Sequence, residues 1–335
     1  MLKFLILLFL TSLVMAQPQG YLNSYHSDPI VSSSQSGSAE HSELVPNQPA
    51  ADQSSKAKEE EAKAKELAQQ VSSLCQEVSN RLASVDYSLC ADLGYDRVLG
   101  YSVQSRPIIA KHYPAHDPEA IRVLFIGGIH GDELTSVSAT FLWMNTLNEH
   151  HSGAFDWWFV PVSNPDGLLR QNEQGRWTST RGNINDVDLN RNFTPSQNRY
   201  QEPRYRQAQQ ARNPRYFPGD EPLSEPESLV IDRMILSYQP DIIFSVHAPH
   251  GIIDFDGPPM PFAPTAGFGS LGHRALGTFP GSLGDFAWNR MGVPVVTIEL
   301  ASAGQMPSDL EIRRMWRDMV RYLFNLQQSQ MLPKR

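Results

Sequence analysis

Histidine and glutamate stand three residues apart in a short glycine-containing stretch, residues 126–133. An apolar run over residues 123–126 is typical of a buried strand, and two glycines interrupt it before His130 and Glu133 follow on a turn. Imidazole nitrogen and carboxylate oxygen are ligands that Zn²⁺ accepts. Two ligands do not complete a metal site, so the rest of the chain would have to supply the others.

Two further residues of suitable type stand at the ends of apolar runs. His247 directly follows residues 242–246, and Glu299 closes residues 295–298. A histidine in such a place is more often a hydrogen-bonded structural residue, but an unpaired buried glutamate costs several kcal/mol and needs a metal, a basic partner or a catalytic role. Two histidines, one glutamate and an open position for water form the ligand set of hydrolytic zinc sites.

The elements that must position these residues alternate between strands and helices. Strands are predicted at 123–126, 155–162, 241–246 and 293–300, helices at 134–148, 224–238, 285–291 and 308–328, and a hairpin over 97–109. This alternation predicts an α/β fold, a mixed and mostly parallel twisted sheet with helices on both faces. The active site of such a sheet lies at the carboxyl ends of its strands, where the residues above are found. Residues 168–219 are polar and cannot form one regular element, and long loops of this kind are usually functional.

The first sixteen residues have the features of a secretory signal peptide. Lys3 precedes an apolar segment at 4–10, and Val14-Met15-Ala16 forms a small-residue cleavage site. A retained membrane anchor is the alternative, although the segment is short for a spanning helix. No later stretch approaches membrane-spanning length, so we expect a periplasmic or secreted protein.

A linker and a helical arm are expected before the catalytic domain. Residues 17–53 are rich in Ser, Gln, Pro and Asn and are predicted to be disordered. Residues 54–93 are predicted to form the helical arm, whose apolar positions share one face: Leu67, Val71, Leu74, Val78 and Leu82. The arm either docks on a partner or folds back onto the catalytic domain, residues 94–330, and we favour the second.

The chain has two cysteines, Cys75 and Cys90. On one continuous helix they would be roughly 22 Å apart, whereas a disulfide requires Cα atoms within roughly 7 Å. A disulfide therefore requires a reversal of the chain near residues 84–87. Such a structural disulfide suits an exported protein, and two unpaired buried thiols are the alternative.

The overall composition limits the partners of this chain of 335 residues. Its hydrophobic content of 40% suits a globular core, and its net charge of −8 with a pI near 5.7 argues against nucleic acid as the main partner.

Five short motifs together resemble the zinc carboxypeptidase family (carboxypeptidase A-like, M14). They are His-Gly-Asp-Glu at 130–133, Asn-Pro-Asp-Gly at 164–167, Val-Asp-Leu-Asn-Arg-Asn-Phe at 187–193, Ser-Val-His at 245–247 and Val-Thr-Ile-Glu-Leu at 296–300. The resemblance covers about residues 97–327. Within the family, the compact loop after the third ligand and Pro280-Gly281-Ser282-Leu283-Gly284 are most similar to bacterial murein peptide amidases.

The resemblance implies one zinc ion per chain and a set of roles around it. His130, Glu133 and His247 would bind the metal, and Glu299 would be the general base that takes a proton from the zinc-bound water. The substrate's terminal carboxylate would be held by Asn190 and Arg191. Arg181 best matches the arginine that polarises the scissile carbonyl, with Arg170 and Arg176 as nearby competitors.

Several other residues have open interpretations. Asp254 and Asp256 could bind the amino group of a diaminopimelate residue or be solvated loop carboxylates. His250 could touch substrate or lie on a surface loop. Asp132 could orient a ligand imidazole or cap the turn. The chain has no match to the substrate-capping tyrosine of digestive carboxypeptidases, which argues against a plain protein carboxypeptidase.

These features predict an exported zinc metallopeptidase, a hydrolase that cleaves an amide bond in peptidoglycan stem peptides. The favoured bond is γ-D-glutamyl–diaminopimelate. Two alternatives would use the same metal site on another substrate: a D,L-carboxypeptidase and an ordinary metallocarboxypeptidase. A non-catalytic wall-binding protein and a deacylase of small N-acyl amino acids are further alternatives.

Overall fold

A computed structural model describes residues 50–259 and 261–329. The predicted signal peptide and the predicted linker up to residue 49 lie outside these residues. Among the described helices, none combines the length and the apolar character that crossing a membrane requires.

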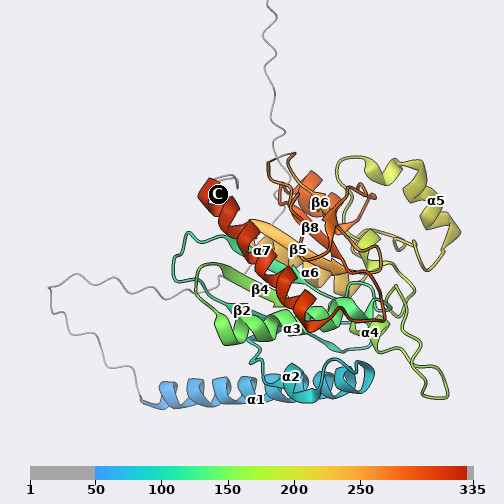
Figure 1. The fold of residues 1–335 in the computed structure, drawn as a ribbon. Coiled ribbons are helices and arrows are strands. Elements are labelled where there is room, and N and C mark those ends of the chain that lie inside the picture. Colours follow the sequence, from blue (N-terminus) through green and yellow to red (C-terminus); the bar gives the residue numbers. More distant parts are fainter. Residues whose placement is uncertain (1–49, 260, 330–335) are drawn as a thin grey trace, which may run out of the picture. The chain divides into compact units, whose positions relative to one another are not determined.

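The described residues form a sheet of eight strands in the order β1-β2-β4-β3-β5-β8-β6-β7. Figure 1 labels β2, β4, β5, β8 and β6 of this sheet. The bounds of the strands are β1 Arg97–Tyr101, β2 Pro107–Tyr113, β3 Arg122–Ile126, β4 Asp156–Val160, β5 Ile242–His247, β6 Ile252–Asp256, β7 Gly272–His273 and β8 Val295–Glu299. The central strands β4, β3, β5 and β8 run parallel, whereas β2 and β6 pair with them antiparallel at either side. The predicted α/β fold with a mixed sheet is therefore confirmed.

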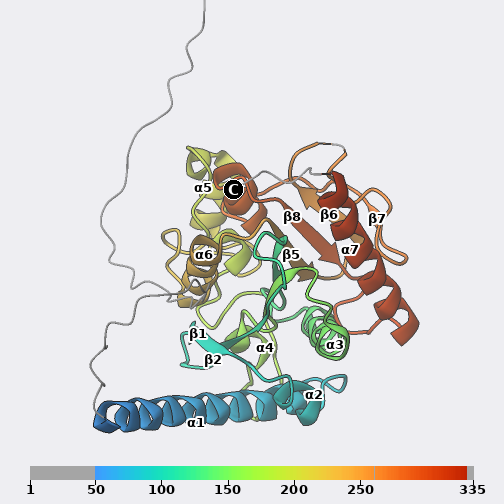
Figure 2. The same ribbon diagram turned by 90° about the vertical axis from the view of Figure 1, so that its left-hand side faces the viewer.

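Helices cover both faces of this sheet (Figure 2). The longer ones are α1 Ala50–Arg81, α3 Leu134–His150, α5 Pro203–Ala211, α6 Pro226–Tyr238 and α7 Asp309–Ser329; the short ones are α2 Tyr87–Ala91, α4 Pro165–Leu168, the 3₁₀ turns η1 Leu189–Arg191 and η2 Arg199–Gln201, and the π-helical η3 Asp285–Arg290.

The alternation of side chains along β3 explains why two cores form. Val123 and Phe125 belong to the core that contains α3 and α7, whereas Leu124 and Ile126 belong to the core beneath α6. Successive residues of a strand point to opposite faces, so a strand with helices on both faces must be apolar throughout. This is the continuous apolar run from which the strand was predicted.

Two strands, β6 and β7, were not predicted. In β6, Asp254 and Asp256 alternate with apolar residues, and acidic residues are rare in strands. The segment is a strand because its backbone pairs with β8, with Ile253 opposite Ile298. This pairing is a tertiary contact between distant parts of the chain.

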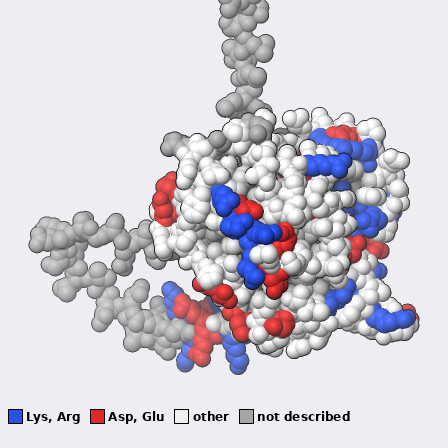
Figure 3. All heavy atoms as spheres, in the orientation of Figure 1, with Lys and Arg blue, Asp and Glu red and all other residues white. Residues whose placement is uncertain are grey.

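The arm folds back onto the domain that carries the sheet. Val71, Val78 and Leu82 are buried in the same core as Val137 and Phe141 of α3. Residues 58–66 of α1 are exposed, with mixed acidic and basic side chains visible at the lower left of Figure 3 and an ion pair between Lys63 and Glu59. The arm therefore folds back onto the catalytic domain, as the single apolar face of its helix predicted.

The chain reverses between α1 and α2, and Cys75 and Cys90 form a disulfide with a Cα–Cα distance of 5.5 Å. Helix α1 begins at Ala50, so residues 50–53, which were assigned to the linker, are helical. Ala50 and Ala51 are strong helix formers and extend the helix beyond the predicted boundary.

Candidate metal centre

The turn between β3 and α3 brings two of the predicted ligands to the carboxyl edge of the sheet. Gly128 takes a positive φ of 64°, and a Cβ atom there would lie 2.7 Å from Val137 Cγ2. Only glycine suits both this conformation and this close approach. His130 follows in the turn, and Glu133 immediately precedes α3, where the positive end of the helix dipole favours a carboxylate.

The other ligand and the predicted base come from neighbouring strands. His247 is the last residue of β5, Glu299 is the last residue of β8, and the two are paired in the parallel ladder. The sheet therefore places both side chains at the same edge as the turn.

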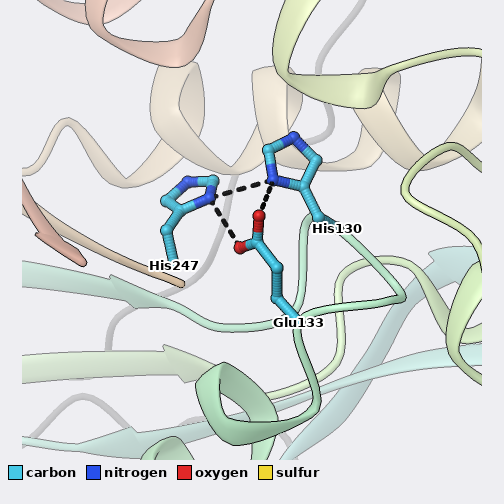
Figure 4. A group of neighbouring side chains, drawn as sticks. All are labelled: His130, Glu133 and His247. Atoms are coloured by element: carbon cyan, nitrogen blue, oxygen red, sulfur yellow. Dashed lines mark hydrogen bonds and ion pairs between the residues drawn. The ribbon is translucent and has the colours of Figure 1, made fainter. Parts of the chain in front are cut away.

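The three predicted ligands meet at one point (Figure 4). His130 Nδ1 lies 2.8 Å from Glu133 Oε1, and His247 Nδ1 lies 3.1 Å from both Glu133 Oε2 and His130 Nδ1. One donor atom from each residue lies within 4.8 Å of the others, and all three side chains are buried. A tetrahedral zinc ion with bonds of ~2.0–2.1 Å holds its ligand atoms roughly 3.4 Å apart. The donor types and spacing therefore fit zinc.

Both ligand imidazoles are oriented through their second nitrogen. His130 Nε2 lies 3.0 Å from the Oδ1 atom of the buried Asp188, and His247 Nε2 lies 3.1 Å from Ser245 Oγ. Such partners set the tautomer and the direction of a ligand histidine. The role considered for Asp132 is wrong, because its side chain instead approaches Arg215 at 3.7 Å. Asp188 lies in the 187–193 motif, but its contact with His130 depends on tertiary structure.

The electrostatics of the site keep Glu133 and Asp188 ionised. Burial would raise the pKa of Glu133, but the nearby His130 and His247 outweigh it and hold the pKa well below its usual range. Burial likewise opposes ionisation of Asp188, and Arg181 and His130 hold its pKa well below the ordinary value. A deprotonated carboxylate is the form that binds a metal or orients an imidazole.

The ligands line a cavity of about 180 Å³ that the predicted substrate-binding residues also line. Among its lining residues are Glu299, Arg181, Asn190, Arg191, His250, Asp254 and Asp256. The structure thus brings together the predicted base, both sets of predicted substrate-binding residues and the metal ligands. Thr278 and Phe279 also line it, and no sequence pattern marked these two residues.

Of the three candidate arginines, Arg181 is the one beside the metal ligands. Its Nη1 donates to Glu133 Oε1 at 3.2 Å, and its Nε donates to Asp188 Oδ2 at 2.9 Å. Arg170 instead pairs with Asp186 and lines a separate cavity. Arg176 is exposed and does not line the site.

Arg191 is held in the cavity with unused hydrogen-bonding capacity. Its Nη1 donates to the Asn190 carbonyl at 2.6 Å, and its guanidinium lies 4.5 Å from the centre of the Phe279 ring. Its Nε is buried without a hydrogen-bond partner in the described chain. Burial lowers the pKa of Arg191, with the charge of Asp188 opposing that effect. An incoming carboxylate would supply the missing partner.

Asp254 and Asp256 lie on β6 and face the same cavity. Asp254 Oδ1 accepts a hydrogen bond from the Leu276 backbone at 2.9 Å. Burial, reinforced by the charges of Asp254 and Asp285 and opposed by Arg199, raises the pKa of Asp256 to about 7. Neither aspartate is a freely solvated loop carboxylate.

His250 is an exposed residue at the mouth of the cavity. Its backbone N–H is directed at Glu299 Oε2 over 3.5 Å. His250 is not part of the three-residue ligand cluster.

Comparison with known proteins agrees with this geometry. Residues 95–254 match the family model described as zinc carboxypeptidase, Peptidase_M14. Murein peptide amidase A of Escherichia coli K12 is 33% identical over 161 residues, which are 46% of this chain and 60% of that protein. Murein peptide amidase A of Vibrio campbellii is 28% identical over 158 residues, 46% of this chain and 58% of that protein. The chain thus matches little more than half the length of these relatives.

The fold is shared with a solved structure of low sequence identity. Bovine thrombin-activatable fibrinolysis inhibitor, in complex with tick carboxypeptidase inhibitor, superposes with a TM-score of 0.54 at 15% identity, over 78% of this chain and 97% of that chain. The family match ends at residue 254, but Glu299 and β8 belong to the same sheet. Residues 95–254 therefore match a zinc carboxypeptidase domain, Peptidase_M14, and His130, Glu133 and His247 form a site whose donor set fits zinc.

Proposed function

We propose that this protein is an exported zinc-dependent peptidase that hydrolyses an amide bond in peptidoglycan stem peptides, the γ-D-glutamyl–diaminopimelate bond in particular. The single observation that carries the proposal is the composition of the cavity: it combines the zinc ligands and Glu299 with the cationic Arg191 and the acidic Asp256. The similarity to murein peptide amidases supports this choice of substrate.

Zinc, Glu299 and Arg181 would each have a different role in hydrolysis of the amide bond. Zinc bound by His130, Glu133 and His247 would supply Lewis acidity and lower the pKa of water toward ~7. Glu299 would take the proton from the attacking water and pass it to the leaving amine. Arg181, beside Glu133, would stabilise negative charge that develops on the scissile carbonyl oxygen.

The leaving residue is recognised by charge at two places. Arg191 has an unpartnered Nε and presents a guanidinium to a substrate carboxylate, with Asn190 beside it. Asn190 is itself positioned, because its Oδ1 accepts a hydrogen bond from the Leu283 backbone at 2.8 Å. These groups favour a bond next to a free carboxylate.

Asp256 supplies the opposite charge in the same cavity. Its raised pKa reflects burial near two other aspartates without a cation close enough to compensate. A substrate ammonium group would be such a cation. Diaminopimelate carries both a carboxylate and a second amino group, so it matches Arg191 and Asp256 together.

A carboxypeptidase that releases a C-terminal lysine is the second candidate. The same Asp256 would bind the lysine ammonium, and the same Arg191 would bind its carboxylate. The predicted signal peptide and the disulfide between Cys75 and Cys90 support action outside the cytosol, because disulfides persist in oxidising compartments.

Digestion of purified substrates separates these candidates. Zinc-loaded protein is incubated with muropeptides that end in diaminopimelate and with ordinary peptides that end in lysine, and products are identified by mass spectrometry. Release of diaminopimelate from the muropeptides is expected. Cleavage of the lysine peptides alone would overturn the wall assignment, and cleavage of neither would favour a non-catalytic protein.

A further inference from the structure

Arg81, the last residue of α1, reaches the loop that carries Arg181. Its Nε donates a hydrogen bond to Ser179 Oγ at 2.9 Å, and its guanidinium lies 5.8 Å from the centre of the Trp177 ring. Ser179 stands two residues before Arg181. The arm, residues 54–93, lies before the part of the chain that matches the zinc carboxypeptidase family model.

The loop is tied to the metal-binding turn on its other side. Ser179 Oγ donates to the Leu168 carbonyl at 2.6 Å, and Thr180 N donates to the Gly167 carbonyl at 3.0 Å. Gly131 N donates in turn to the Arg181 carbonyl at 3.3 Å.

Glycines allow these segments to touch. A Cβ atom on Gly131 would lie 2.1 Å from the carbonyl carbon of Gly167, and one on Gly167 would lie 2.5 Å from the Gly182 carbonyl oxygen. Because close-packed segments transmit displacements, a shift of residues 179–182 would move both Arg181 and the turn that carries His130.

A second contact joins the arm to the same region. Arg106 Nε donates to Glu77 Oε2 of α1 at 3.1 Å, while its Nη1 donates to Asp166 Oδ1 at 2.8 Å. Asp166 lies in α4 and is fully buried. The arm therefore contacts α4 through Arg106 and the following loop through Arg81.

The arm is held firmly enough to act as a support. The disulfide joins α1 to α2, and Ser84 Oγ donates to Ser138 Oγ of α3 at 2.7 Å. None of the described residues that line the metal-site cavity comes from the arm, so any effect on the reaction must pass through the loop.

We propose that the disulfide-closed arm is a positioning element of the active site, in which Arg81 sets the position of Arg181 through Ser179. The proposal rests on the proposed function for the role of Arg181 in hydrolysis. Arg81 touches neither the metal ligands nor the cavity and is a positioning residue.

Two variants of α1 distinguish positioning from general stabilisation of the fold. Arg81→Ala removes the contact with the Arg181 loop. Gln70→Ala is the matched control, since Gln70 Nε2 donates to the Tyr101 hydroxyl of β1 at 2.9 Å and so joins the same helix to a different part of the domain. Both are measured in the full, zinc-loaded chain.

For Arg81→Ala we expect a fall in kcat of roughly tenfold with a nearly unchanged KM, because a small misplacement of a group that acts on the transition state lowers kcat. Arg81→Lys restores part of the rate, since the ammonium group can still donate to Ser179. The double variant Arg81→Ala/Ser179→Ala falls no further than its single variants. Gln70→Ala keeps the kcat of the parent protein.

Amide hydrogen exchange tests the positioning without activity. Thr178 N donates to the Arg170 carbonyl at 2.9 Å, and Thr180 N donates to Gly167. Arg81→Ala is expected to speed exchange at these two amides, and Gln70→Ala is not. Unchanged exchange and unchanged kcat in Arg81→Ala would overturn the proposal, as would equal losses in both variants that follow their melting temperatures.

The two readouts separate this proposal from the proposed function. If the parent protein hydrolyses no peptide, the function fails while loop exchange still tests the contact. If the parent is active and Arg81→Ala retains full activity with faster exchange, the function stands and the positioning role is refuted.

Discussion

His247 and Glu299 are opposite one another in register at the ends of the parallel strands β5 and β8. Adjacent strands are ~4.8 Å apart, so the sheet itself sets the spacing between the backbone of His247, a candidate metal ligand, and that of Glu299, the proposed base. The loops around the site can vary without disturbing this pair. The relationship also explains why both residues follow directly from apolar runs.

Glu299→Gln should abolish most of the hydrolysis while the protein keeps its zinc. General-base catalysis contributes roughly 10²–10⁴-fold, so kcat on the cleaved muropeptide should fall at least a hundredfold. Zinc content measured by mass spectrometry should remain one per chain, since Glu299 is outside the ligand cluster. Glu119→Gln, an exposed position away from the cavity, is the control. A fully active Glu299→Gln protein would refute the assignment of the base.

His247→Ala should remove the metal, whereas His250→Ala should retain it. His247 contributes one of the three converging donor atoms, and His250 lies three residues farther along at the mouth of the cavity. Zinc at about a thousand times its dissociation constant stabilises a folded protein by about 4 kcal/mol. The parent and His250→Ala should therefore melt higher with zinc than after chelation, and His247→Ala should show no such shift. Equal zinc retention in both variants would contradict the ligand set.

Asp188→Asn should weaken zinc binding by about 10–100-fold, because loss of a partner that orients a ligand imidazole has effects of this size. Asp132→Asn is the matched control in the metal-binding turn, since its carboxylate approaches Arg215 rather than an imidazole. Competition with a zinc-binding dye gives both affinities. A larger loss in Asp132→Asn would show that Asp132 is the orienting residue.

Binding of a diaminopimelate substrate should weaken as the pH falls through about 7. The pKa of Asp256 in the free protein is raised to about 7 by burial and by Asp254 and Asp285, against the effect of Arg199. Above that pH the carboxylate is ionised and attracts an ammonium group; below it the carboxyl is protonated and neutral. KM should therefore rise on acidification in the parent protein.

Asp256→Asn should raise KM at pH 8 and remove this component of the pH dependence. A substrate analogue without the second amino group serves as the comparison, since its KM should not respond to Asp256. A parent-like KM profile in Asp256→Asn would show that another group binds the ammonium.

Replacing both cysteines by serine should lower the free energy of unfolding by about 3 kcal/mol, the value expected for a closed loop of this length. Cys75 and Cys90 are separated by 15 residues. Urea denaturation of oxidised parent and double variant measures the difference. No change in stability would mean that burial of the arm, rather than the disulfide, maintains the reversal.

Much of the fold could be predicted because its signals are local. The apolar runs at 123–126, 242–246 and 295–298 are buried on both faces, and their lengths distinguish them from helices. Strand β6 gave no such signal. Its two aspartates, Asp254 and Asp256, line the metal-site cavity, and acidic residues are not typical of strands. The segment is a strand because its backbone pairs with β8.

By itself, the sequence determined which residue types stand at the strand ends, and hence that His130, Glu133, His247 and Glu299 belong together. The carboxyl ends of parallel strands lie at one edge of the sheet regardless of the loops that connect them. The grouping of these four residues could therefore be predicted without the tertiary structure. The resemblance already favoured Arg181 among the three arginines, and tertiary structure brings it beside Glu133. Tertiary structure alone decided that Asp188 rather than Asp132 orients His130 and that Arg81 supports Arg181. These contacts join side chains from loops and helices distant in sequence, and their partners depend on how those segments pack rather than on local periodicity.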